Sequence, residues 1–323
     1  MNQTPPGSAR RSFLLASAGL LSAAALARPH LARAAAPPLR VANQKGGLRS
    51  LLEASGEAAK LSFPIEWSEF PAAAPLLEAL SAEAVDVGTM GDLAFLGVFA
   101  SGAPVRAYAA TRADPRSQAI LVRGDSAARG LADLRGRKVA ANRGGWGQFL
   151  LLAAAERAGL PLDAVEPAAL GPAEAALAFR SGSVDGWAIW EPYVSIEVAQ
   201  FGARVIEDGT GITPTVSFLA AHQRPLRERR DQLAELLRAQ QAGWRWAAGN
   251  VDAYAAANAR LTRLPEAPVQ AAFRRQATRA IPIDAAVVAE LQAAADRAAR
   301  YGVIRQRIAV ADALDTGFSL AAG

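Results

Sequence analysis

The chain has 323 residues, of which 51% are hydrophobic and 20% are charged, which excludes a disordered or fibrous protein. Cysteine is absent and histidine occurs only at His30 and His222, so disulfides, thiolate metal sites, cysteine nucleophiles and multi-histidine metal sites are excluded. The formal charge of +5 comes mostly from residues 1–34, which hold four arginines and no acid, so no clustered basic face for nucleic acid is left.

The first 34 residues predict export. Arg10-Arg11 precedes an apolar run over 14–27, and Ala32-Arg33-Ala34 has the small-x-small pattern of a signal peptidase site. The run is shorter than the ~20 residues that a membrane-spanning helix needs. We therefore expect a twin-arginine signal peptide, residues 1–34, cleaved after Ala34, and a soluble periplasmic protein. An uncleaved anchor and the general secretory route remain alternatives.

The rest of the chain alternates predicted strands and helices in two series. The first series has strands at 39–42, 62–67 and 85–88, helices at 46–55, 73–82 and 92–100, and returning strands at 105–111 and 119–123. The second has strands at 138–141 and 184–189, helices at 147–158, 172–181 and from 192, and closing strands at 203–207 and 216–221. Only helices are expected after Leu226. This order predicts two α/β lobes.

Ligands of parallel α/β sheets bind beyond the carboxyl ends of the strands. That rule places the loops 44–47, 89–92, 143–148 and 190–191 at a candidate cleft. Glycines open the helices after three of these loops, and a helix N-terminus directs free N–H groups and partial positive charge at a ligand. The loops could hold an oxyanion without lysine or arginine. The alternative is that these glycines are only turn and cap residues.

Several segments resemble the periplasmic solute-binding proteins of ABC importers for aliphatic sulfonates, taurine and nitrate. The similarity is collinear over about Leu39 to Ala221. Its most specific parts are Leu131–Ala140 (LADLRGRKVA) and Val184–Tyr193 (VDGWAIWEPY), supported by Leu39–Gly47 (LRVANQKGG) and Val85–Asp92 (VDVGTMGD).

The resemblance implies the type II periplasmic-binding-protein fold, with two α/β lobes joined by two crossing strands and a ligand cleft between them. The crossings are expected near 119–123 and 216–221, with lobe I at 35–122 and 219–323 and lobe II at 123–218. It also implies a protein without catalytic residues, cofactor or metal. This protein would capture a small, anionic, sulfonate-like solute and deliver it to a membrane permease and ATPase. We expect a monomer that does not bind nucleic acid.

Carried over position by position, the resemblance places the ligand contacts in the cleft loops. They are Gln44, Gly46, Phe70, Gly91, Asp92, Gly144, Gly145, Trp146, Gly147, Gln148, Trp190 and Glu191.

The chain departs from the family pattern at three of these places. Gly144 to Gln148 replaces a serine-rich run that ends in histidine, Glu191 replaces an aspartate, and Asp92 to Phe95 replaces a proline-rich helix start. Trp146 could stack on an aromatic ligand or pack on the lobe surface. Glu191 would repel an anion but could accept a hydrogen bond from a ligand with a donor.

Two other classes of function stay open. Thiamine-pyrimidine synthases share this fold, so the chain could be a similar enzyme or could bind an aromatic or pyrimidine ligand. Such an enzyme needs histidine and lysine in the cleft, whereas the mature chain has only His222 and three lysines, Lys45, Lys60 and Lys138. A structural role is expected for His222. The third possibility is a sensor ectodomain, for which no signalling segment is evident.

Overall fold

The computed structural model describes Met1 and residues 36–318. Residues 2–34 of the expected signal peptide, including Arg10-Arg11 and the cleavage site after Ala34, lie outside the described residues. Among the residues that are described, no helix is long and apolar enough to cross a bilayer. The described ranges also hold no group of three or more acidic or histidine side chains that could bind a metal ion.

The first sheet has six strands in the order β11-β4-β10-β3-β1-β2. Their bounds are β1 Leu39–Gln44, β2 Ile65–Phe70, β3 Val87–Gly91, β4 Val105–Arg112, β10 Val216–His222 and β11 Arg279–Ile281. Strand β1 pairs in parallel with β2 and β3, whereas β10 runs antiparallel to β3 and β4. Leu39, Val41 and Ala42 of β1 are fully buried, as expected for a parallel strand covered on both faces.

The second sheet has five strands in the order β7-β6-β8-β5-β9. Their bounds are β5 Gln118–Val122, β6 Lys138–Ala141, β7 Glu166–Ala169, β8 Gly186–Trp190 and β9 Arg204–Asp208. Strand β6 is parallel to β7 and β8, and β5 is antiparallel to β8 and β9. The two mixed sheets with their helices confirm the predicted class of two α/β lobes.

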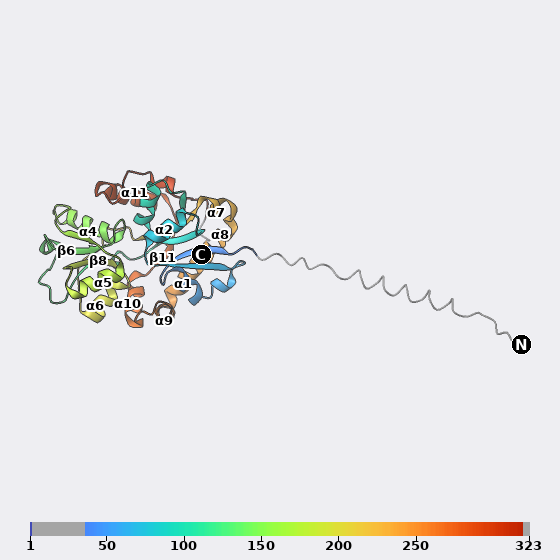
Figure 1. Cartoon of the computed structure of the whole chain (residues 1–323), viewed down its shortest axis with the longest axis horizontal. Coiled ribbons are helices and arrows are strands. Elements are labelled where there is room, and N and C mark those ends of the chain that lie inside the picture. The colour runs from blue at the N-terminus through green and yellow to red at the C-terminus, as the bar shows by residue number, and fades with distance from the viewer. Residues whose placement is uncertain (2–35, 319–323) are drawn as a thin grey trace. The chain divides into compact units, whose positions relative to one another are not determined.

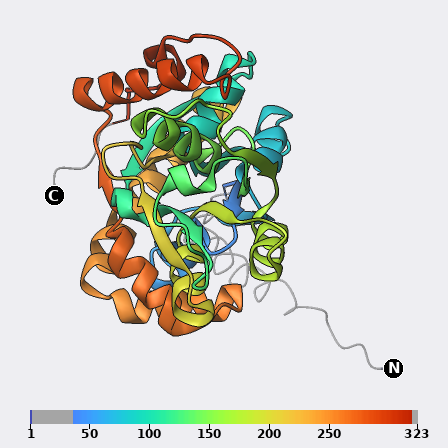
Figure 2. The same ribbon diagram turned by 90° about the vertical axis from the view of Figure 1, so that its left-hand side faces the viewer.

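Eleven α-helices in the described residues cover these sheets. They are α1 Leu48–Ala54, α2 Ala73–Ser81, α3 Asp92–Ala100, α4 Trp146–Arg157, α5 Pro172–Ser181, α6 Tyr193–Phe201, α7 Gln223–Glu228, α8 Arg230–Gly249, α9 Val251–Thr262, α10 Glu266–Gln276 and α11 Ala285–Arg300. Figure 1 shows α4, α5 and α6 around the second sheet, and α1, α2 and α7 around the first. In Figure 2 the red α11 and the orange α9 and α10 lie at opposite ends of the view.

Two features of the chain path differ in detail from the expectation. The expected crossing strands each belong to one sheet, because β5 pairs with β8 and β9, and β10 pairs with β3 and β4. The chain passes between the sheets in the short connections 113–117 and 209–215 instead. If each lobe is defined by its sheet, β5 belongs to the second lobe, although its residues fall within the range 35–122 expected for lobe I. The C-terminal part also contains a strand, β11, which pairs with β4.

One hydrophobic cluster spans both lobes, and a second lies within the second lobe. A single cluster of buried side chains includes Leu93 and Leu96 of α3 in the first lobe and Phe149 and Leu150 of α4 in the second. Outside the core, Tyr301 donates a hydrogen bond of 2.5 Å to Glu156 at the end of α4. Buried side chains of the helices that start at the cleft loops thus belong to one cluster that spans both lobes.

Candidate ligand-binding site

Three of the predicted residues lie at one edge of the first sheet. The register pairs Gln44 with Phe70 at the ends of β1 and β2, and the Gln44 side-chain amide donates to the Thr89 carbonyl at 3.3 Å. Thr89 belongs to β3, which ends at Gly91. The carboxyl ends of three parallel strands thus meet where the topology rule expects a ligand.

Gly46 shapes the turn after β1. Its φ of +76° is in the left-handed region that favours glycine, and an added Cβ would lie 2.6 Å from Thr262 Cγ2. Asn258 donates hydrogen bonds to the Gly46 carbonyl at 2.6 Å and to Ser50 Oγ at 2.8 Å. Helix α9 therefore fixes this turn, a contribution that the sequence did not indicate because Asn258 is more than 200 residues away.

Asp92 begins α3 and is fully buried. Its Oδ1 accepts hydrogen bonds from the Leu93 N–H at 2.6 Å and the Trp146 indole N–H at 2.5 Å, while Oδ2 has no partner of normal geometry among the described residues. Burial raises the pKa of Asp92 to about 7, against the lowering effect of hydrogen bonds from Trp146, Leu93 and, more weakly, Val216. Burial therefore favours the protonated form of this carboxyl.

Trp146 connects the two lobes. It opens α4 in the second lobe, and besides its bond to Asp92 its indole packs on Gly91, where an added Cβ would lie 2.9 Å from Cε2. The indole thus packs against the first lobe, and stacking on an aromatic ligand stays a prediction. Gly91 is needed here for close approach, since its φ of −68° suits any residue.

The loop before α4 is bonded internally. The Gly144 N–H donates to the Gln148 side chain at 2.8 Å, and the Gly147 N–H donates to the Asn142 side chain at 3.1 Å. An added Cβ on Gly147 would lie 2.6 Å from the Ala188 carbonyl of β8, so glycine permits the close contact between α4 and the sheet. Asn142 is a further loop residue that sequence reasoning missed, although it directly follows β6.

The Glu191 carboxylate is hydrogen-bonded by Ser195 and lies close to an arginine. Its carboxylate accepts from the Ser195 N–H and hydroxyl, both at 2.9 Å, and Arg275 Nε lies 3.4 Å away. Burial raises the pKa of Glu191, while Ser195 and Arg275 act in the opposite direction. Arg275 comes from α10 and had not been predicted. The neighbouring Trp190 is half-buried, with its ring edge-on to Tyr193 at 6.5 Å.

The predicted residues therefore form two groups. Direct contacts join Gln44, Gly91, Asp92 and Trp146 through β3, with Phe70 paired to Gln44. The loop from Gly144 to Gln148 joins this group through α4. Trp190 ends β8 and Glu191 follows it, but their contacts run to α6 and α10.

His222, the candidate for enzyme chemistry, lies elsewhere. It ends β10 opposite Val105, whereas Ser217 at the other end of that strand pairs with Gly91. His222 caps the start of α7, and its Nδ1 lies 2.6 Å from Glu83 Oε1. These contacts agree with the structural role expected for this histidine.

The chain is similar to known binding proteins over most of its length. Residues 69–253 match the NMT1/THI5-like family. Over 223 residues the chain is 39% identical to an aliphatic sulfonates-binding protein of Escherichia coli strain K12, a match that covers 68% of this chain and 69% of that protein.

Solved structures of sulfonate-binding proteins are also similar to this chain. The alkanesulfonate-binding protein SsuA from Xanthomonas axonopodis pv. citri, bound to MOPS, matches with a TM-score of 0.80 and 30% identity, over 87% of this chain and 99% of that one. The periplasmic aliphatic sulphonate binding protein SsuA from Escherichia coli matches with a TM-score of 0.75 and 30% identity, over 88% and 94% of the two chains. The chain therefore belongs to the NMT1/THI5-like family and has the fold of its periplasmic binding proteins.

Proposed function

We propose that this protein is the solute-binding component of an ABC importer and that it captures a small organic sulfonate between its lobes. The observation that carries the proposal is the 30% identity and TM-score of 0.80 to a protein bound to MOPS, itself an alkanesulfonate. The chemistry of the cleft loops agrees with such a ligand. Neutral donors are present there, namely the second N–H of the Gln44 amide, beside the one that bonds Thr89, and backbone N–H groups at the start of α4.

We keep the ligand contacts expected from the sequence, except that Glu191 is given a different role. Gln44, Gly91, Asp92 and the loop from Gly144 to Gln148 form the anion-binding side. Glu191 is satisfied by Ser195 and Arg275, so we assign it a positioning role at the start of α6. With Arg275 beside it, the Glu191 charge opposes an anion less than an isolated carboxylate would.

The partners and the location follow from the same proposal. The protein would be exported by a signal peptide, residues 1–34, cleaved after Ala34, and would deliver its ligand as a monomer to a permease and ATPase in the membrane. An enzyme is the less favoured alternative, because His222 lies at the far end of β10 from Gly91.

Isothermal titration calorimetry tests this function. We expect MOPS and a linear alkanesulfonate to bind with a 1:1 stoichiometry and a Kd in the micromolar range or tighter, and taurine, nitrate and an aminopyrimidine to bind at least tenfold more weakly. Taurine ends its short chain in a strongly hydrated primary ammonium and nitrate has no carbon chain, so neither supplies the apolar surface that MOPS or a linear alkanesulfonate would bury. Tight binding of the aminopyrimidine, without binding of either sulfonate, would contradict the proposal and favour the pyrimidine alternative.

A further inference from the structure

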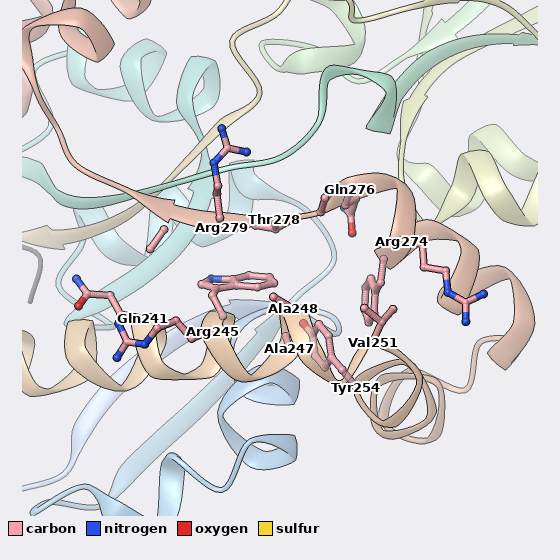
Figure 3. A pocket seen from close by; sticks show the side chains of 14 residues that line it. Gln241, Arg245, Ala247, Ala248, Val251, Tyr254, Arg274, Gln276, Thr278 and Arg279 are labelled. Carbon is pink, nitrogen blue, oxygen red and sulfur yellow. The ribbon is translucent and has the colours of Figure 1, made fainter. Parts of the chain in front are cut away.

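A cavity of about 630 Å³ lies among the C-terminal helices. It is enclosed by the second half of α8, the start of α9, the end of α10 and β11 (Figure 3). None of the residues predicted to bind the ligand lines it. Its volume falls within the range of ~300–1,000 Å³ that is typical of small-molecule sites.

Aromatic side chains form one wall of this cavity. The rings of Tyr254 and Phe273 stack with centroids 4.3 Å apart and planes 15° apart, and Trp244 meets Tyr254 edge-on at 6.1 Å. Tyr254 is 4% exposed, so this wall is held in place by the surrounding helices. Fixed aromatic faces favour a flat, apolar ligand group.

The polar lining is positively charged. Arg245, Arg274 and Arg279 line the cavity, and no aspartate or glutamate does. Arg274 is paired with Asp252 at 2.8 Å, whereas Arg245 and Arg279 form no ion pair with any described residue. Both are exposed, and they come from opposite walls, Arg245 from α8 and Arg279 from β11 (Figure 3). Guanidinium groups bind carboxylates and sulfonates and stack on aromatic rings.

We propose that this cavity is a second binding site, for an organic anion with an aromatic body. The aromatic body packs against Trp244, Tyr254 and Phe273, and the anionic head pairs with one of the two rim arginines, Arg245 or Arg279, whose guanidinium groups point away from each other (Figure 3). This site is independent of the sulfonate site between the lobes, because it shares no lining residue with the cleft loops.

The fluorescence of 8-anilinonaphthalene-1-sulfonate tests this site, since the dye brightens when it leaves water. We expect saturable 1:1 binding to the folded wild-type chain that excess MOPS does not displace. The double variant Arg245→Gln/Arg279→Gln and the cavity-filling variant Ala248→Phe are each expected to raise the dye Kd at least tenfold. Arg238→Gln, on an exposed part of α8 outside the cavity, is the matched control and should change the Kd less than twofold.

The sulfonate group of the dye supplies a second control. N-phenyl-1-naphthylamine has the same rings without the charge, and we expect it to bind at least tenfold more weakly. Equal binding of the two dyes, an unchanged Kd in both cavity variants, or displacement by MOPS would overturn the proposal. Titration of the same cavity variants with MOPS tests the two sites separately, and the Kd for MOPS should match that of the wild type. If the wild type fails to bind MOPS, the proposed function is contradicted, but the result for the cavity still stands.

Discussion

Replacing Asp92 with asparagine is expected to remove a pH dependence of about 4 kcal/mol from the free energy of unfolding. Burial raises the pKa of Asp92 from 3.8 to about 7, and each pH unit of difference between the folded and unfolded states corresponds to about 1.4 kcal/mol. Because the folded-state pKa is the higher one, the folded protein gains stability from the protonated form. That stability is present below about pH 4 and is lost as the pH rises through about 7.

Urea unfolding of the ligand-free protein between pH 4 and pH 8 measures this effect. As the pH rises over this range, the wild-type chain should lose stability relative to Asp92→Asn, because the asparagine at position 92 does not titrate. Asp86→Asn is the matched contrast. Asp86 is also buried, but hydrogen bonds from Arg40, together with the charge of Arg229, hold the pKa of that carboxyl below its usual value in spite of burial. The ionised Asp86 therefore stabilises the folded protein at neutral pH, and this contribution is lost as the pH falls through its folded-state pKa. Parallel curves for the wild type and Asp92→Asn would show that the Asp92 environment is more polar than described above.

Replacing Trp146 with alanine is expected to weaken alkanesulfonate binding by about 10–100-fold. The indole N–H donates to Asp92 in the other lobe, and the ring packs on Gly91. A hydrogen bond to a charged group contributes about 1.5–3 kcal/mol, so its loss lowers the population of the closed arrangement that binds the ligand.

Calorimetry with MOPS at pH 8, where Asp92 is ionised, measures this change. Trp146→Phe keeps a ring against Gly91 and removes only the N–H, so it should show a smaller loss than Trp146→Ala. If Trp146→Ala binds MOPS as tightly as the wild type or more tightly, the indole occupies the place of the ligand and does not hold the lobes together.

The local patterns predicted the framework of the cleft well. The burial of Leu39 and Val41 in β1, and the proline and glycine that bound α5 at Pro172 and Gly182, follow directly from hydrophobic runs and turn chemistry. Strand β11 was missed because three residues give no periodic signal, and it is defined only by its pairing with β4.

The contacts of the site were less predictable. Trp146 and Asp92 were both candidates, but 54 positions separate them and nothing local indicates that one bonds the other. Arg275 and Asn258 lie on C-terminal helices whose sequence shows only amphipathic character, so their links to Glu191 and Gly46 depend on tertiary packing. The aromatic cavity between α8 and α10 was missed for the same reason.

A crystal structure of the protein with bound MOPS would test the location of the sulfonate site most directly. The sulfonate oxygens should lie within hydrogen-bonding distance of the Gln44 amide and of backbone N–H groups at the start of α4, near Gly91. The morpholine ring should point away from the Asp92–Trp146 pair. A sulfonate bound only in the cavity lined by Tyr254 and Phe273, with none between the lobes, would contradict the proposed site.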